Sequence, residues 1–329
     1  MKTRTRVAAS ALATTLGLSL AACSGATSSE DAGAQELSSL RYMVPNAPGS
    51  GWDTTARTAA RSLQDADLVN TTEVFNVDGA NGTVGLARLA NEEGNSELVM
   101  QMGLGLVGSV VTLNSDVTLE DVTPIAKMVE DYEVVFVNAD SPYQTIDDLV
   151  EAWKANATDL AVGGGSSPGG ADHLVPVLMA KEVGIKTTEV AYTSLGGSGV
   201  MPAVLGGQVD FAVTGAGDVL EQADAGKVRV LAVSGEERLE ELPDVPTLKE
   251  SGVDVTLTNW RGVVAPPGIT EEEKARLVEL FDELHASPQW QEAVEANGWG
   301  DAYISGEEFG TLVEEQDAEV RQVIAELGL

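Results

Sequence analysis

The chain has 329 residues, of which 52 are acidic and 19 are basic, so its formal net charge is −33, and 43% of its residues are hydrophobic. At roughly 150 residues per domain, this length and apolar content favour two globular domains. So acidic a surface argues against nucleic acid or an anionic membrane face as a partner, because both would repel it. One cysteine and two histidines are too few for a disulfide framework, an iron–sulfur cluster or a cysteine-rich zinc site. We expect neither a metal nor a cofactor.

The N-terminus has the pattern of an export signal. Three basic residues precede the uncharged stretch 7–22, which is shorter than the about 20 residues of a membrane-spanning helix. The stretch ends in Leu-Ala-Ala-Cys23, which resembles the lipobox of bacterial lipoproteins, where the cysteine is diacylated and becomes the new N-terminus. The alternative is an ordinary signal peptide that is cleaved after a small residue. We expect a lipoprotein signal peptide over 1–22, lipidation of Cys23 and a flexible tether over 23–37, so that the protein is extracytoplasmic and anchored to the cell membrane.

From residue 38 onward, short β-type runs alternate with stretches of helical periodicity. This alternation predicts parallel sheets with helices on both faces. We expect strands over 40–44, 72–77, 97–102, 133–138, 160–163, 188–192, 209–214 and 228–234. We expect helices from about Asp53 and over 83–91, 146–155, 171–183, 200–206, 219–225, 270–287 and 307–327.

The short connections fit two similar α/β lobes joined by crossing strands, near 136–141 and near 259–264. We expect lobe 1 to hold residues 38–136 and 262–329, and lobe 2 to hold residues 137–261. Ligands of open α/β sheets bind outside the carboxyl ends of the strands. In this chain those positions are glycine-rich loops, so we expect the ligand between the lobes.

Four such loops follow predicted strands and run into predicted helices, at 45–53, 78–83, 163–170 and 192–199. Free N–H groups and the positive end of a helix dipole favour a carboxylate or phosphate there, and serine hydroxyls add uncharged donors. The alternative is that these glycines and serines are ordinary turn and cap residues. The candidate ligand-binding residues in these loops are Asn46, Gly49, Ser50, Gly51, Trp52, Asp53, Asn81, Gly82, Ser166, Ser167, Gly169, Gly170, Tyr192, Gly196 and Gly197.

Two further pairs of residues complete the candidate site. Trp260 and Arg261 lie at a predicted crossing, where they would meet a ligand; for Arg261 a structural ion pair is the alternative, and for Asp53 a helix N-cap. Residues 103–108 match GxGxxG, but the match does not follow the first strand and is weak as a dinucleotide-binding signature. We therefore keep Gly103 and Gly105 only as residues that line the cleft.

Serine hydrolysis is the enzymatic alternative, and it needs a serine, a histidine and an acid that meet in space. The sequence marks no such set. His173 follows Asp172 at a predicted helix start, where packing or capping is the simpler role.

Motifs in a fixed order along the chain resemble those of one protein family. The opening segment 43–57 contains Pro-Gly-Ser-Gly-Trp-Asp, the segment 75–85 contains Asp-Gly-Ala-Asn-Gly-Thr, and 164–174 contains a Gly/Ser loop followed by His-Leu. Further similar segments follow at 190–197, 205–210, 225–233, 244–248 and 259–268. From residue 40 the chain resembles the substrate-binding proteins of tripartite tricarboxylate transporters, the Bug family. Many members have an aromatic residue and two prolines before a glycine pair, where this chain has Asn46-Ala47 and Ser50-Gly-Trp52. In this respect the chain looks closer to the tricarboxylate-binding branch.

The resemblance implies a two-lobed, periplasmic-binding-protein-like fold of type II and a function without catalysis. It also implies a small organic carboxylate, with two or three acid groups, held largely by backbone amides, hydroxyls and waters. The membrane subunits of a tripartite carrier would be the partners of what we expect to be a monomer. Two alternatives stay open, an exported hydrolase of carboxylic esters and a receptor that signals to a membrane sensor kinase.

Overall fold

The computed structural model describes residues 37–327, and the statements below concern these residues. The predicted signal peptide, Cys23 and the tether up to residue 36 lie outside the described residues. Leu37, where the predicted tether ends, is buried in the apolar core. No helix in the described part of the chain is long and apolar enough to cross a membrane.

Sheet A is built around three parallel strands near the start of the chain. The order is β2, β1, β3, β9, β4, and β10 pairs with β4. Strands β9, β4 and β10 each run antiparallel to the strand that they pair with in this sheet. The strands are β1 (Ser39–Val44), β2 (Thr71–Asn76), β3 (Leu98–Gly103), β4 (Thr123–Asn138), β9 (Thr258–Ala265) and β10 (Ile304–Ser305).

Sheet B contains the other half of β4. Strands β7, β5 and β6 are parallel to one another, and β4 runs antiparallel to both β7 and β8. The strands are β5 (Val162–Gly164), β6 (Tyr192–Ser194), β7 (Phe211–Gly215) and β8 (Val228–Val233). The carboxyl ends of β5, β6 and β7 therefore lie at one edge of this sheet.

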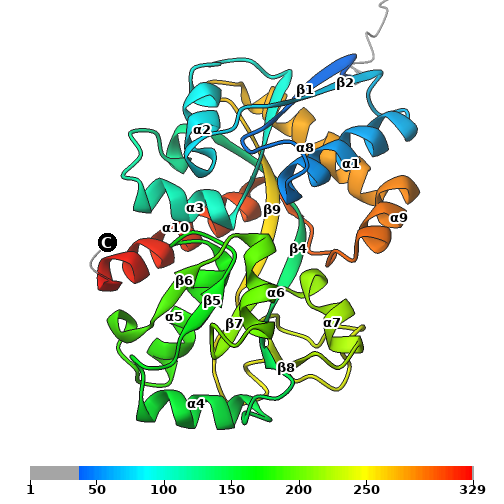
Figure 1. The fold of residues 1–329 in the computed structure, drawn as a ribbon. Helices are drawn as coiled ribbons and strands as arrows, with labels where there is room; N and C mark the ends of the chain where they lie inside the picture. Colours follow the sequence, from blue (N-terminus) through cyan, green and yellow to red (C-terminus); the bar gives the residue numbers. More distant parts are fainter. Residues whose placement is uncertain (1–36, 328–329) are drawn as a thin grey trace, which may run out of the picture. The chain divides into compact units, whose positions relative to one another are not determined.

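Strand β4 joins the two sheets, as Figure 1 shows. It pairs with β9 up to Tyr132, with β7 from Glu133 and with β8 from Val134. The change of partner therefore comes before the predicted crossing near 136–141. The sheets are mixed, whereas the alternation predicted parallel ones. The chain leaves sheet A along β4 and returns along β9, and two strands that carry it out and back run in opposite directions.

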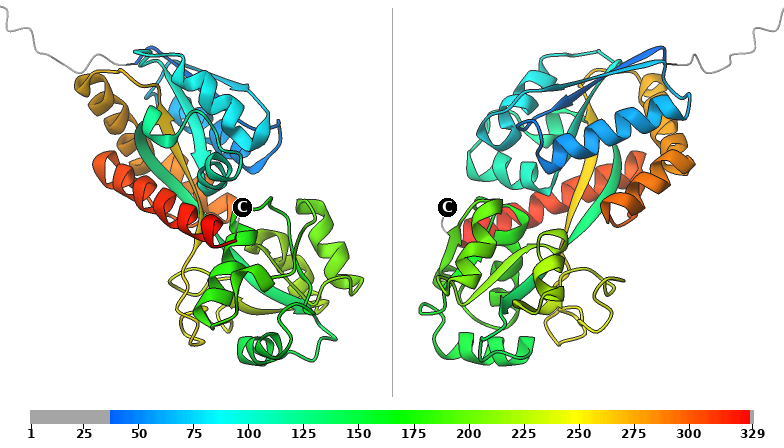
Figure 2. Two further views of the ribbon diagram at one scale, coloured as in Figure 1. Left: turned by 90° about the vertical axis from the view of Figure 1, so that its left-hand side faces the viewer. Right: turned by 45° about the vertical axis from the view of Figure 1, so that its right-hand side comes forward.

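Helices cover both faces of sheet A. Helices α1 (Gly51–Asp65), α8 (Glu271–Ala286) and α9 (Pro288–Asn297) bury one apolar cluster against it. Helices α2 (Thr83–Ala90), α3 (Leu104–Thr112) and α10 (Gly306–Leu327) cover the other face. Helix α10 contacts both α3 and β4, and Figure 2 shows it running alongside the strands that join the sheets.

Sheet B has the same layered arrangement. Helices α4 (Ile146–Ala155) and α5 (Ala171–Glu182) share the apolar cluster of α2, α3 and α10. Helices α6 (Gly197–Leu205) and α7 (Leu220–Asp224) close the other face over a separate cluster. Four short 3₁₀ turns complete the described fold: η1 (Ala80–Gly82), η2 (Leu119–Asp121), η3 (Thr187–Glu189) and η4 (Ala216–Asp218).

Local sequence explains where several helices begin. Thr145 and Thr270 accept a hydrogen bond from the backbone N–H three residues later, and the acid at that later position bonds back to the cap. This capping box satisfies N–H groups that lack an acceptor within the helix. Ser287 separates α8 from α9, whereas the sequence predicted only the first of these helices. The predicted strand 188–192 is instead η3 followed by β6.

Candidate functional site

The first glycine loop, between β1 and α1, is fixed by Asp53. This buried carboxylate accepts hydrogen bonds from the backbone N–H of Gly49 (2.8 Å), Arg57 Nε (2.9 Å) and Asn76 Nδ2 (2.8 Å). Burial alone would raise the pKa of Asp53, but these hydrogen bonds, with the charge of Arg57, hold it below its usual value. Asp53 therefore shapes the loop, while Ser50 is the N-cap of α1.

Three of the candidate glycines surround Trp52. A Cβ at Gly82 or Gly103 would lie 3.2 Å or 3.1 Å from the half-buried indole, and one at Gly105 would lie 3.6 Å away. The structure thus brings together four residues that the sequence placed in separate loops. Their closeness also gives the glycines at 82 and 103 a packing role, since a side chain there would crowd the indole or, at Gly103, a carbonyl of β9.

The matching loop of lobe 2 lies between β5 and α5. Tyr192 donates its hydroxyl to the backbone carbonyl of Ser166 (2.8 Å), and His173 Nδ1 accepts from the N–H of Gly169 (3.1 Å). Burial lowers the pKa of His173 to about 4, so the ring is neutral at pH 7. The hydroxyl of Ser166 is buried and has no hydrogen-bond partner among the described residues. Among the described residues it is the one buried side-chain polar atom of this loop without a hydrogen-bond partner.

Helix α3 of lobe 1 meets this loop directly. A Cβ on Gly108 would lie 2.0 Å from the carbonyl oxygen of Gly169, closer than any side chain could come. Gly169 also has a positive φ of 90°, which glycine adopts at no steric cost. The third glycine of the GxGxxG match therefore serves contact between the lobes, and Gly103 is the N-cap of α3.

The remaining loop candidates lie at the surface or in turns. Asn46 bonds the backbone N–H of the next residue and, through its carbonyl, the side chain of Asn76. Gly196 has a positive φ of 69° and precedes Gly197, the first residue of α6. The other members of this group are Asn81, Ser167 and Gly170; Asn81 and Ser167 are exposed, and Gly170 is the N-cap of α5.

Arg261 and Trp260 have different surroundings. The Arg261 guanidinium bonds Thr55 Oγ1 (3.0 Å) and forms an ion pair with Asp131, which ties α1 to β4. The Trp260 side chain is buried and packs edge-on against Phe309 of α10 (5.6 Å between ring centroids).

A pocket of about 670 Å³ opens where β4 changes sheets. Two of the predicted ligand-binding residues line this pocket, namely Gly51, at the start of α1, and Arg261. Its other lining residues come from β4, the turn after β7, residues 237–241 and the end of α9. The whole lining contains two arginines, Arg238 and Arg261, and six acids. The acids are Asp131, Asp218, Glu237, Glu240, Glu241 and Glu295.

Sequence reasoning missed a buried acid beside this pocket. Glu133 has no exposed surface, and it pairs across the ladder with Gly215, which lines the pocket. Burial raises the pKa of Glu133 well above its usual value, and hydrogen bonding by the Asn259 side chain opposes that rise. The sequence contained a sign of this acid, because Glu133 directly precedes the apolar run Val134–Val137 and belongs to the same predicted strand. Buried carboxylates are rare unless they are paired.

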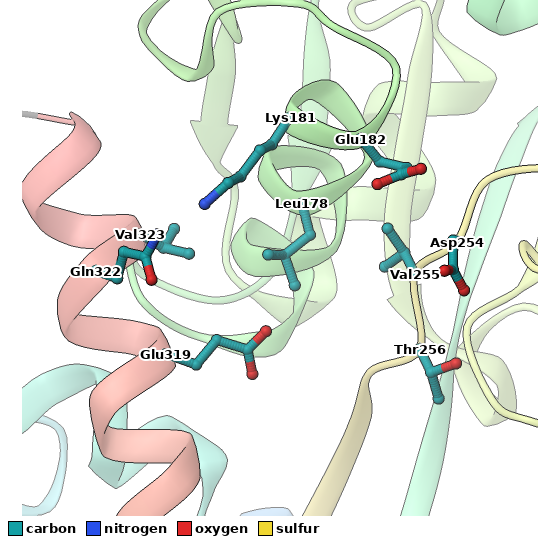
Figure 3. Close-up of a pocket in the computed structure, with 9 residues that line it drawn as sticks. All are labelled: Leu178, Lys181, Glu182, Asp254, Val255, Thr256, Glu319, Gln322 and Val323. Carbon is teal, nitrogen blue, oxygen red and sulfur yellow. The ribbon is translucent and has the colours of Figure 1, made fainter.

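A second hollow lies away from the glycine loops, between α5, α10 and residues 254–256 (Figure 3). Lys181 extends from α5 toward α10 in this view, and its ammonium pairs with Glu326 of α10 (2.9 Å). Three acids, Glu182, Asp254 and Glu319, also line the hollow. None of the residues predicted to bind ligand takes part in it.

A serine hydrolase needs a histidine that bonds its serine, but in the described chain both histidines bond other groups. His285 Nε2 bonds Asp301 (2.8 Å), and its ring stacks on Tyr303. His173 is engaged by the backbone of Gly169, as described above.

Comparison with known proteins identifies the family. The model of the tripartite tricarboxylate transporter family receptor (TctC) matches residues 56–329. The chain belongs to this receptor family. The chain is 30% identical over 272 residues to the protein BugT of Bordetella pertussis, covering 79% of this chain and 80% of BugT. It is 29% identical over 247 residues to a UPF0065 protein from the ttuE–ttuC' intergenic region of Agrobacterium vitis, covering 74% of this chain and 70% of that protein.

Solved structures share its fold. A TctC solute-binding protein from Polaromonas, solved without ligand, is 25% identical with a TM-score of 0.74, covering 88% of this receptor and 98% of that chain. MatC of Rhodopseudomonas palustris, solved with bound malate, is 22% identical with a TM-score of 0.68, covering 87% of this chain and 98% of MatC. A further R. palustris protein, solved with adipate, is 20% identical with a TM-score of 0.72, covering 88% of this chain and 97% of that protein. The predicted α/β fold of a periplasmic-type binding protein and the predicted family are both confirmed.

Proposed function

We propose that this receptor binds a small organic di- or tricarboxylate between its lobes and delivers it to the membrane subunits of a tripartite tricarboxylate-type carrier. In this proposal the protein acts as a monomer without catalysis, and a lipid on Cys23 anchors it to the cell membrane. Family membership supports the receptor role. The malate and adipate in two proteins of the same fold support a carboxylate as the ligand.

The unpartnered hydroxyl of Ser166 carries the argument from the structure. It lies in the loop that enters α5, beside the N-terminal turn of that helix. Buried hydroxyls nearly always find a partner, and first-turn N–H groups have no acceptor within the helix. A ligand carboxylate placed here would accept hydrogen bonds from both, with the helix dipole in its favour.

The charge of the chain makes such local donors necessary. At −33 the long-range field repels a carboxylate, and the Arg261 guanidinium already has Asp131 and Thr55 as partners. Recognition by short, desolvated hydrogen bonds is compatible with this charge, whereas a clamp of free arginines would need cations that the described site uses elsewhere.

Isothermal titration calorimetry tests the proposal. We expect at least one compound in a series of succinate, malate, glutarate, adipate and citrate to bind the mature protein. Ser166→Ala should weaken that ligand about twofold to tenfold, which corresponds to roughly 0.5–1.5 kcal/mol for one hydrogen bond. Ser251→Ala is the matched control, because Ser251 donates to the Thr247 carbonyl outside the site, and its affinity should be unchanged. Absence of binding across the series, or equal losses in both variants, would contradict the proposal.

A further inference from the structure

The loop between β5 and α5 is held near each end by a ring side chain. Tyr192, on β6, donates its hydroxyl to the Ser166 carbonyl (2.8 Å). In the first turn of α5, His173 Nδ1 accepts from the Gly169 N–H (3.1 Å). The two rings also contact each other edge-on, with 4.8 Å between their centroids. A satisfied polar network of this kind fixes a single arrangement of the backbone.

His173 holds this loop only as a neutral ring. Because Nδ1 accepts from an N–H, it carries no proton, and the ring proton lies on Nε2. The ring is buried (6% exposed), and burial lowers the pKa of His173 to about 4, so the acceptor is available at neutral pH. Asp172, the titratable neighbour of His173 on α5, is engaged by the Gly165 N–H (2.7 Å). It fixes the first part of the same loop.

The residue that His173 holds is the one that contacts lobe 1. A Cβ on Gly169 would lie 3.1 Å from both Cα and the carbonyl oxygen of Gly108, on α3. Ser166 lies across the next residue of the loop, because a Cβ on Gly170 would come within 2.7 Å of Ser166 Oγ. A shift of the Gly169 backbone would therefore disturb both the contact between the lobes and the hydroxyl for which we propose a ligand.

We propose that His173 is a positioning residue for the ligand, whose neutral imidazole, supported by Tyr192, fixes the loop that binds the ligand and meets α3. The inference rests on the proposed function, because the shape of the loop affects affinity only if the loop takes part in binding. His173 itself acts through the Gly169 N–H. A loop that samples other shapes binds in proportion to the fraction of molecules that have the competent one. Loss of this hydrogen bond should therefore lower affinity as well as stability.

Two substitutions separate the acceptor from the ring. His173→Asn keeps an acceptor atom two bonds from Cβ, where Nδ1 stands in histidine, and loses the ring. His173→Phe keeps a ring beside Tyr192 and loses the acceptor. His285→Phe is the matched control, because it makes the same exchange at the second histidine, which lies on α8, bonds Asp301 and stacks on Tyr303.

The first experiment needs no ligand and follows the Gly169 N–H by NMR at pH 7. A bond to a buried acceptor slows amide exchange, so His173→Phe should raise its exchange rate about tenfold or more, and His173→Asn about threefold or less. His285→Phe should leave the rate unchanged. The chain has two histidines, so this control also assigns the ring signals, and His173 should carry its proton on Nε2. A proton on Nδ1, or an unchanged rate in His173→Phe, would overturn the inference.

The second experiment titrates succinate, malate, glutarate, adipate and citrate calorimetrically into the same variants. For each compound that binds the wild type, His173→Phe should weaken binding about tenfold or more, because the competent fraction of the loop falls. His173→Asn should stay within about threefold and His285→Phe within about twofold. If His173→Phe does not fold, Tyr192→Phe decides the question, since it removes only the hydroxyl that bonds the Ser166 carbonyl. It should weaken binding about threefold or more, and wild-type affinity in this variant would overturn the inference.

The outcomes separate the two proposals. If His173→Asn and His173→Phe bind alike, either as tightly as the wild type or equally weakened, the acceptor of His173 does not position the loop. The inference is then wrong, while the carboxylate receptor stands. If no compound of the series binds the wild type, the proposed function fails and the inference fails with it, even where the exchange rates of the Gly169 N–H agree with our expectation.

Discussion

Single side chains at the ends of the glycine loops have sharply different surroundings. Asp53 is buried among three donors, one each from the glycine loop, helix α1 and strand β2, and Arg261 is held by Asp131 and Thr55. The Ser166 hydroxyl, in contrast, has no partner among the described residues. Polar atoms that are already satisfied shape the loops, and the unsatisfied ones are where a ligand gains most, since an unmet buried group costs about 1–3 kcal/mol.

Asp53→Asn tests the shaping role. It should destabilise the protein by about 1–3 kcal/mol at pH 7, because the charge-assisted bonds from Arg57 and Gly49 are weakened. The folded-state pKa of Asp53 is depressed, so its contribution is present above the unfolded value of about 3.9 and is lost as the pH falls through the lower folded value. Urea unfolding at pH 7 and near pH 2.5 should show the difference shrinking.

Asp65→Asn is the control for this measurement. Asp65 is exposed on the same helix, and surface changes of this kind stay within about 0.5 kcal/mol. Equal effects of the two substitutions at pH 7 would show that the Asp53 hydrogen bonds do not stabilise the loop.

Helices and loops decide how closely the lobes approach each other. The central contact is α3 against the loop that enters α5, where Gly108 meets the Gly169 backbone. Helix α3 was missed from the sequence, since two glycines within nine residues weaken a helical prediction. The same glycines permit the close approach, so the feature that hid the helix is the one that its packing requires.

Gly108→Ala and Gly310→Ala form a matched pair for this contact. Both glycines lie inside helices, where alanine alone would stabilise by about 0.5–1 kcal/mol. A Cβ at Gly310 meets its nearest atom at 3.9 Å, so this variant should show the gain. At Gly108 the backbone of the facing loop must move, and we expect a loss of about 1–3 kcal/mol and a larger radius of gyration by small-angle scattering. Indistinguishable melting and scattering curves for the two variants would show that the lobes do not rely on this contact.

At the scale of the whole molecule, charge and location belong together. A chain of net charge −33 gains nothing from an anionic membrane surface, so electrostatic attraction would not hold it there, whereas the proposed lipid on Cys23 would. Cys23→Ser should therefore move the protein from the membrane fraction to the soluble fraction, in a host that processes lipoproteins, while its ligand affinity stays that of the wild type. Fractionation followed by blotting is the measurement. A variant that stays with membranes after a high-salt wash would contradict the lipid anchor.

Motif order determined the family from the sequence alone, and hydrophobic periodicity predicted most of the helices and strands, with α4 at its observed bounds. Local patterns carry such information because caps, turns and amphipathic faces depend on residues close together in the chain. The mixed direction of the sheets, the ion pair of Arg261 with Asp131 and the complete burial of Glu133 were decided by tertiary structure. Asp131 and Arg261 are 130 residues apart, and Glu133 lies opposite Gly215 only because β4 enters sheet B antiparallel to β7. Burial and the partners of a charge depend on contacts between distant segments, and these arise only when the chain folds.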